Sequence, residues 1–82
     1  MSDGEVVQLI RGALVKVRPD LAREFEAIDI ETRFEDLPLD SIDNLQMITF
    51  LEDHLGFLFQ EEDFGTIETV RDVKALIEKR AP

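Results

Sequence analysis

Apolar residues recur every three or four positions in three stretches of the chain, and this spacing restricts its fold more than any other feature. Such spacing places them on one face of an α-helix, whereas a half-buried strand needs an alternation that the chain lacks. The "SDGE" pattern predicts that the first helix is capped by Ser2 or Asp3, and Arg18-Pro19 ends it. Its apolar face consists of Val6, Leu9, Ile10, Ala13, Leu14 and Val17.

Two later stretches predict two further main helices. The second helix runs from about Ser41 to Leu55, and Gly56 follows as a C-terminal glycine. Leu45 borders its apolar stripe, whereas Ile42 lies outside it, toward the polar face. "TVRD" at 69–72 caps the last helix, and a short helix is expected at 61–64. The buried stripes of the two main helices are Met47, Ile48, Leu51 and Leu55 in one, and Val70, Val73, Leu76 and Ile77 in the other.

Residues 19–40 show no clear periodicity and contain Pro19 and Pro38. They are expected to form a long loop with one short helical turn. The chain has no cysteine, so neither a disulfide nor a thiolate metal site can support the fold. We therefore predict a single domain over residues 1–82. It is all-α, a small four-helix bundle with three main helices, a short third helix and a long loop between the first and second helices.

The net charge of −10 is concentrated in the middle of the chain. Between Phe34 and Val70 there are ten acidic residues and no lysine or arginine. Such a segment repels nucleic acid and anionic lipid and attracts basic protein surfaces, although an acidic face kept for solubility explains it equally well. No apolar run could span a membrane, and the first residues lack the basic start of a signal peptide. A soluble, cytoplasmic, monomeric protein without nucleic-acid or membrane partners is expected.

Catalytic and metal sites are poorly supported. Ser41 and His54 lie thirteen residues apart on one predicted helix, about 20 Å, so they do not form a nucleophile–base pair. His54 is better explained as a surface residue that compensates the helix dipole. "DLPLDSIDNLQM" has the length of a calcium-binding loop but lacks its glycine and its final glutamate. Asp40 and Asp43 are interpreted as solvated acids of a first helical turn, and no catalytic residue or metal ligand is predicted.

Ser41 leaves two interpretations open. "DS" before an apolar helix is a common cap, and either residue can serve. If Asp40 is the cap, Ser41 occupies the first helical position with its hydroxyl free. A phosphodiester attached there would face the free N–H groups and the positive end of the helix dipole.

The stretch "DSIDNLQMITFLEDHLG" resembles the D-S-L-D helix of acyl carrier proteins, and the similarity extends to the length, acidity, long first loop, "QEED" and "TVRDVKALI". The resemblance implies that Ser41 carries 4′-phosphopantetheine derived from coenzyme A. The arm's thiol would hold cargo as a thioester, so the chain itself would not be an enzyme. Asp40 and Asp43 would be recognised by a phosphopantetheinyl transferase (holo-ACP synthase). Acyl-loading and acyl-transferring enzymes with basic docking surfaces would meet the second helix through Ile42, Gln46, Thr49, Glu52 and Asp53.

Several residues depart from the family pattern. Pro38-Leu39 replaces a pair of small residues, Gln46 an acid and Thr49 an apolar residue, while Phe59 and Phe64 stand near the acyl cavity in place of smaller aliphatics. These changes favour a carrier for a specialised lipid or secondary-metabolite pathway over housekeeping fatty acid biosynthesis. Two alternatives stay open: an aminoacyl or peptidyl carrier protein, and an unmodified acidic helical module that binds a basic partner.

Overall fold

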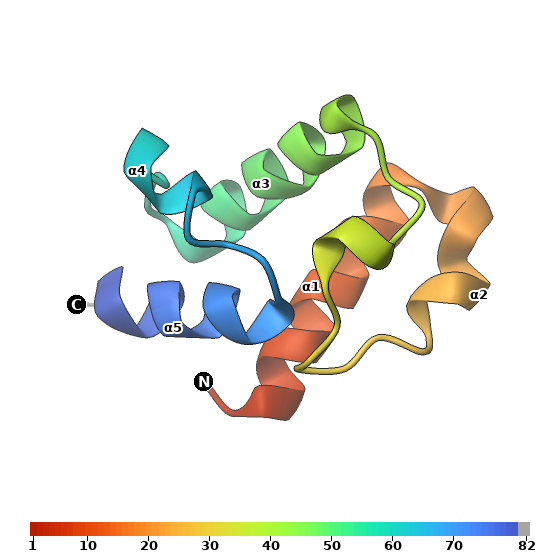
Figure 1. Cartoon of the computed structure of the whole chain (residues 1–82), viewed down its shortest axis with the longest axis horizontal. Helices are drawn as coiled ribbons and strands as arrows, with labels where there is room; N and C mark the ends of the chain where they lie inside the picture. Colours follow the sequence, from red (N-terminus) through yellow and green to blue (C-terminus); the bar gives the residue numbers. More distant parts are fainter. Residues whose placement is uncertain (81–82) are drawn as a thin grey trace.

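The computed structural model describes residues 1–80 and shows three main helices with shorter helical segments between them (Figure 1). The main helices are α1 (Asp3–Val17), α3 (Ser41–Leu55) and α5 (Val70–Arg80), and the short ones are α2 (Ala22–Phe25) and α4 (Glu61–Phe64). Two 3₁₀ turns, Pro19–Leu21 and Phe34–Asp36, complete the order. The predicted all-α bundle is confirmed, including the bounds of α3 and of the short helix α4.

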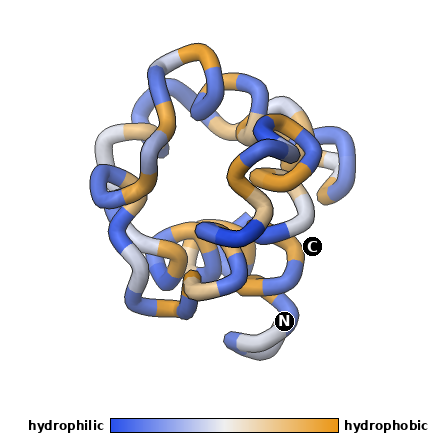
Figure 2. Tube along the Cα trace, turned by 90° about the vertical axis from the view of Figure 1, so that its right-hand side faces the viewer, coloured by the Kyte–Doolittle hydropathy of each residue, from blue (hydrophilic) through white to orange (hydrophobic). Residues whose placement is uncertain are grey.

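The core forms where α1 packs against α3 and α5. Hydrophobic and hydrophilic residues alternate along the helical turns (Figure 2), as expected for helices with one buried face. The buried side chains include Val6, Ile10, Ala13 and Leu14 of α1, Met47, Ile48 and Leu51 of α3, and all four predicted residues of α5. Burial of each large apolar side chain contributes about 2 kcal/mol to folding, so the three stripes together hold the bundle. Leu9, Val17 and Leu55, also predicted there, are only partly buried at the rim.

Local sequence signals set the helix ends. Ser2 rather than Asp3 caps α1, because its hydroxyl accepts the Glu5 N–H at 3.2 Å and the Glu5 carboxylate accepts the Ser2 N–H at 2.9 Å. At the end of α3, Gly56 adopts a φ of 79°, a left-handed conformation that strains residues with a Cβ. The α5 helix starts as predicted, with the Thr69 hydroxyl accepting the Asp72 N–H.

The long first loop is more ordered than predicted. It contains two helical segments, the stretch from Pro19 to Phe25 and the turn Phe34–Asp36, where one short turn was expected. Phe25 and Ile28 are buried in the core. Arg11 of α1 donates hydrogen bonds to the carbonyl oxygens of Phe25, Glu26 and Ile28 at 3.0, 3.3 and 3.3 Å. Contacts with α1 therefore stabilise segments that are too short to show a helical period.

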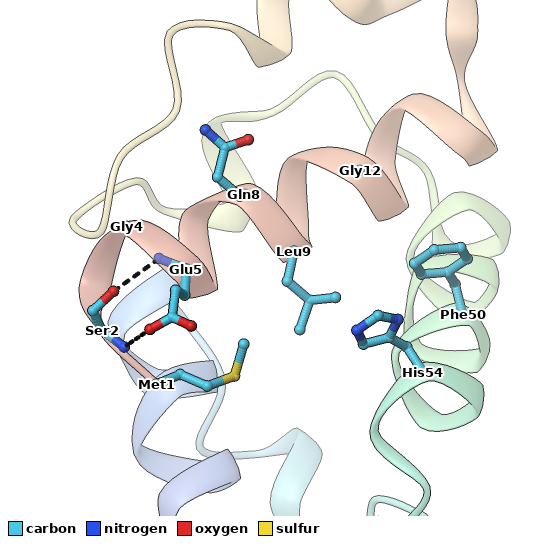
Figure 3. A pocket seen from close by; sticks show the side chains of 9 residues that line it. All are labelled: Met1, Ser2, Gly4, Glu5, Gln8, Leu9, Gly12, Phe50 and His54. Atoms are coloured by element: carbon cyan, nitrogen blue, oxygen red, sulfur yellow. Dashed lines mark hydrogen bonds between the residues drawn. The ribbon is translucent and has the colours of Figure 1, made fainter.

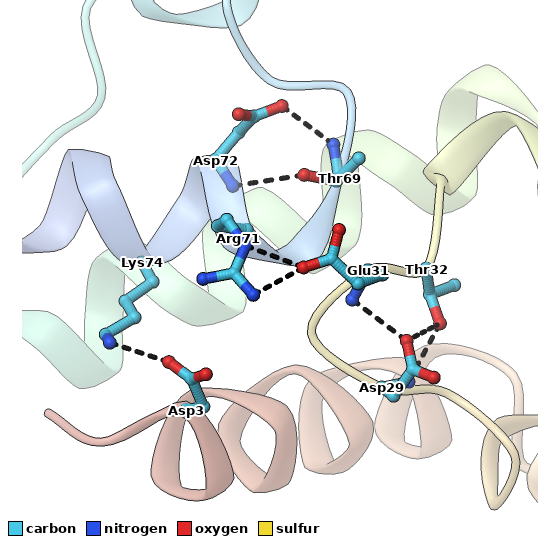
Figure 4. A network of polar contacts seen from close by, with 8 residues as sticks. All are labelled: Asp3, Asp29, Glu31, Thr32, Thr69, Arg71, Asp72 and Lys74. Atoms are coloured by element: carbon cyan, nitrogen blue, oxygen red, sulfur yellow. Dashed lines mark hydrogen bonds and ion pairs between the residues drawn. The ribbon is translucent and has the colours of Figure 1, made fainter.

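The second half of this loop is attached to the start of α5 (Figure 4). The Val70 and Arg71 N–H groups donate to the carbonyls of Thr32 and Ile30 at 3.1 and 2.9 Å, and the Arg71 guanidinium pairs with Glu31. Lys74 of α5 also contacts Asp3 of α1 at 2.6 Å. These links close the bundle and fix the path of the chain toward residue 41. Among residues 1–80, no helix combines the length and the apolar character needed to cross a membrane.

Candidate functional site

Ser41 is the first residue of α3, and the cap of this helix is Asp40. The Asp40 carboxylate accepts the Asp43 N–H at 2.8 Å, and the Asp43 carboxylate accepts the Asp40 N–H at 3.3 Å. This reciprocal pair decides between the two interpretations left open by the sequence. Ser41 is exposed, and its hydroxyl makes no hydrogen bond to any other residue in the described part of the chain. The Ser41 hydroxyl is therefore accessible to a modifying enzyme.

The segment before Asp40 is anchored on both sides of Pro38. Leu37 and Leu39 pack against the core, and the Leu39 N–H donates to the Leu37 carbonyl at 2.8 Å in a tight turn. Pro38 itself is exposed and fixes the backbone between them. Pro38 and Leu39 thus form a turn directly before Asp40 and the start of α3.

Asp43 corrects one prediction, because it is not a solvated acid. Its residue surface is only 7% exposed, and its carboxylate accepts a hydrogen bond from the Arg18 guanidinium at 2.9 Å. Arg18 is the C-terminal cap residue of α1 and also holds Asp20 at 2.8 Å. The hydrogen bonds that Arg18 donates to the carboxylates of Asp20 and Asp43 raise the pKa of Arg18, and Arg18 lowers the pKa of Asp20. Sequence reasoning missed Arg18, since nothing in local spacing links it to a residue 25 positions away.

The predicted partner-facing side of α3 is mostly exposed. Ile42 is 66% exposed, and Gln46, Thr49 and Asp53 are exposed as well. Leu45, which was expected at the edge of the core, is 64% exposed and adds a second apolar side chain to this face. Glu52 is only partly accessible, because its carboxylate accepts the Phe59 N–H at 2.9 Å and holds the loop after α3.

One hollow lies away from Ser41. It has a volume of about 740 Å³ and is lined by parts of α1 and α3, among them Leu9, Phe50 and His54 (Figure 3). The His54 ring stacks on Phe50, with centroids 6.3 Å apart. His54 is exposed near the end of α3, as expected, and about 20 Å along the helix from Ser41, so the two residues cannot act as a pair.

A second hollow of about 350 Å³ begins one helical turn from Ser41, at Asn44. It lies between α3, α4 and the long loop, and its apolar lining includes Leu39, Met47, Ile48, Phe64 and Ile67. Phe64, which the resemblance places near an acyl cavity, lines this hollow. Phe59, by contrast, is buried in the core and does not line this hollow.

The acidic middle segment is partly neutralised by arginines from outside it. Besides the Arg18–Asp43 pair, Glu35 pairs with Arg33 at 2.6 Å and Asp63 pairs with Arg80 at 2.8 Å. Within residues 1–80, no three histidine, cysteine or acidic side chains gather closely enough to hold a metal ion. Three exposed acids of this region form no ion pair within residues 1–80: Asp40 beside Ser41, Asp36 in the loop before it, and Asp53 near the far end of α3.

Comparison with known proteins gives consistent matches. Residues 12–77 match the family described as a phosphopantetheine attachment site. The chain is 37% identical over 62 residues to the acyl carrier protein of Streptococcus pyogenes serotype M1, which covers 76% of this chain and 81% of the relative. It is 29% identical over 80 residues to the acyl carrier protein of Akkermansia muciniphila, covering 96% of both. A chloroplastic acyl carrier protein 1 of Casuarina glauca is 38% identical over 53 residues, or 65% of this chain and 39% of the relative.

Proposed function

Because the chain belongs to the acyl carrier protein family, we propose that Ser41 carries a 4′-phosphopantetheine arm and delivers acyl cargo between partner enzymes. The observation that carries this proposal is that two different residues at the start of α3 provide the helix cap and the exposed hydroxyl. Asp40 caps the helix, so the Ser41 hydroxyl is exposed and unbonded within residues 1–80. The arm supplies a thiol that holds cargo as a thioester, and this chain has no thiol of its own.

The residues at the start of α3 fit a phosphate-linked group. The N–H groups of the first turn, apart from the one that Asp40 accepts, have no intrahelical acceptor, and the helix dipole adds positive potential there. A phosphodiester on Ser41 would meet this positive end rather than the exposed acids farther along α3. The chain's own residues therefore stabilise the attached phosphate and keep the site open to solvent.

The exposed face of α3 supports transfer by partner enzymes. Ile42 and Leu45 offer apolar contacts, and Asp40 and Asp53 offer negative charge to basic docking surfaces. We propose that a phosphopantetheinyl transferase and acyl-loading or acyl-transferring enzymes use this face, that these partners perform the catalysis, and that the chain meets them as a monomer in the cytoplasm. The apolar hollow beside Asn44 favours acyl over aminoacyl cargo.

We also propose a specialised lipid or secondary-metabolite pathway, on the basis of the partner-facing residues. Gln46 and Thr49 are both exposed where partners are expected to dock, so their departure from the family pattern changes the surface itself. A housekeeping fatty acid synthase reconstituted with this carrier tests the point. Chain elongation as fast as with the synthase's own carrier would contradict the specialised role.

Attachment is tested by intact mass. The protein is incubated with coenzyme A and a broad-specificity phosphopantetheinyl transferase, and a gain of one phosphopantetheine per chain is expected. The chain has only two serines, so Ser2→Ala is a matched control for Ser41→Ala. The gain should persist in Ser2→Ala and disappear in Ser41→Ala. An unmodified wild-type protein, or a gain that survives Ser41→Ala, would falsify the proposal and favour an unmodified interaction module.

A further inference from the structure

Asp43 stands where the family resemblance places a docking acid, yet its carboxylate is directed inward. One of its oxygens accepts hydrogen bonds from both Arg18 and the backbone N–H of Asp40. The residue is 7% exposed, so a cation of a docking protein has little access to it. By contrast, the neighbouring Asp40 and Ile42 are exposed.

Arg18 is itself held in place. Its backbone N–H donates to the Leu14 carbonyl at 2.8 Å and ends α1, while Asp20 binds the other side of its guanidinium through two hydrogen bonds. A guanidinium fixed on one edge by Asp20 presents its free edge in a defined direction, toward Asp43. The end of α1 thus fixes the position of Asp43.

Asp43 in turn holds the backbone on both sides of Ser41. Its carboxylate holds the Asp40 N–H and its own N–H is held by Asp40, so residues 40 and 43 close a ring around Ser41 and Ile42. The chain of contacts runs from α1 through Arg18 and Asp43 to the backbone that carries the Ser41 hydroxyl. Among the hydrogen bonds and ion pairs of residues 1–80, the Arg18–Asp43 pair is the one that joins the end of α1 to this turn.

We propose that Arg18 and Asp43 act as one unit that positions Ser41 for attachment of the arm, and that Asp43 is not a docking contact for the transferase. This inference rests on the proposed function of Ser41. It makes Arg18 and Asp43 positioning residues and leaves the electrostatic contact with the transferase to exposed acids such as Asp40.

The test is a double-mutant cycle on the rate of arm transfer from coenzyme A. Arg18→Gln, Asp43→Asn and the double variant are compared with wild type at a temperature where circular dichroism shows all of them folded. Asn at position 43 still accepts the Asp40 N–H but cannot form the ion pair. Arg33→Gln is the matched control, because Arg33 loses the same charge but pairs with the exposed Glu35, away from Ser41.

Each single variant should lower kcat about tenfold with little change in KM, since a misplaced hydroxyl affects the reaction more than docking. The double variant should be no slower than the slower single variant, because both remove the same unit. The salt dependence of kcat/KM should stay that of wild type in Asp43→Asn, and Arg33→Gln should retain the wild-type kcat.

Three results would overturn the proposal while leaving attachment at Ser41 intact. These are an increase in KM with a weaker salt dependence in Asp43→Asn, additive effects in the double variant, or an Arg18→Gln protein that behaves like Arg33→Gln. A wild-type protein that gains no arm at all would instead refute the proposed function, so the two failures are distinguishable.

Discussion

The capping boxes of α1 and α3 have the same local geometry but different surroundings. At α1, Ser2 and Glu5 exchange hydrogen bonds and both are exposed. At α3, Asp40 and Asp43 make the same exchange, but Asp43 is buried and bound to an arginine from the end of α1. A local motif is thus enough to start a helix, whereas a tertiary partner is needed to fix that start relative to the rest of the bundle.

The start of α4 repeats one half of the arrangement found at α3. The Asp63 carboxylate accepts the Gln60 N–H at 2.7 Å and binds Arg80 of α5 at 2.8 Å, and Asp63 is only 4% exposed. A helix of four residues such as α4 is too short to be stable alone. At both α3 and α4, a buried acid–arginine pair therefore fixes the start of the helix relative to another helix.

The first prediction compares the loss of stability when the capping box of α3 is disrupted with the loss when the capping box of α1 is disrupted. Asp43→Ala removes a charged hydrogen bond and half of a capping box, so it should lower the free energy of unfolding by about 2 kcal/mol. Glu5→Ala should have a distinctly smaller effect, because its box has no tertiary partner. Urea unfolding measures both.

Asp53→Ala is the control for this comparison, since Asp53 is an exposed acid of the same helix. It should change stability by less than about 0.5 kcal/mol. Equal losses for Asp43→Ala and Glu5→Ala would show that the Arg18 contact adds nothing to the local cap.

The second prediction concerns Ser2 and Asp40, the residues that cap α1 and α3. Ser2→Ala and Asp40→Ala each remove a cap acceptor and should each lower the free energy of unfolding by about 1 kcal/mol. Asp40→Asn should retain nearly full stability, because asparagine caps as well as aspartate. In the arm-transfer assay, however, Asp40→Asn should raise the KM of the transferase, since the exposed charge is lost. Unchanged kinetics in Asp40→Asn would limit Asp40 to capping.

Much of the fold could be predicted because the determining signals are local. The bounds of α3 follow from Asp40, Gly56 and the stripe between them, and the exposure of Ile42 follows from its angle on the helix. Leu45 was harder to place, because a residue at the edge of a stripe is buried or exposed according to what packs beside it.

The pairing of the acids could not be predicted from spacing. Arg18–Asp43 and Asp63–Arg80 join residues on different helices, and their contact depends on how those helices pack. The same limit applies to the first loop, where hydrogen bonds from Arg11 stabilise turns with no periodicity of their own. Sequence reasoning therefore located Ser41 as a candidate site but not the contacts that hold it.

The smallest expected effect is on the pH dependence of thermal stability. It distinguishes the start of α4, where Asp63 binds Arg80 of another helix, from the capping box of α1, whose hydrogen bonds are local. The Gln60 N–H and Arg80 lower the pKa of Asp63 below its ordinary value of 3.8. A carboxyl group whose pKa is lower in the folded state than in the unfolded state stabilises the fold at pH values above its unfolded-state pKa. This stabilisation is lost as the pH falls through its folded-state pKa. Asp63→Asn should therefore melt below wild type at pH 7, and the difference should shrink as the pH falls below 3.8, whereas Glu5→Gln should show a smaller difference than Asp63→Asn at pH 7. Thermal melts from pH 7 downward measure this, and a difference that does not shrink as the pH falls would mean that Asp63 stabilises α4 by its shape and not by its charge.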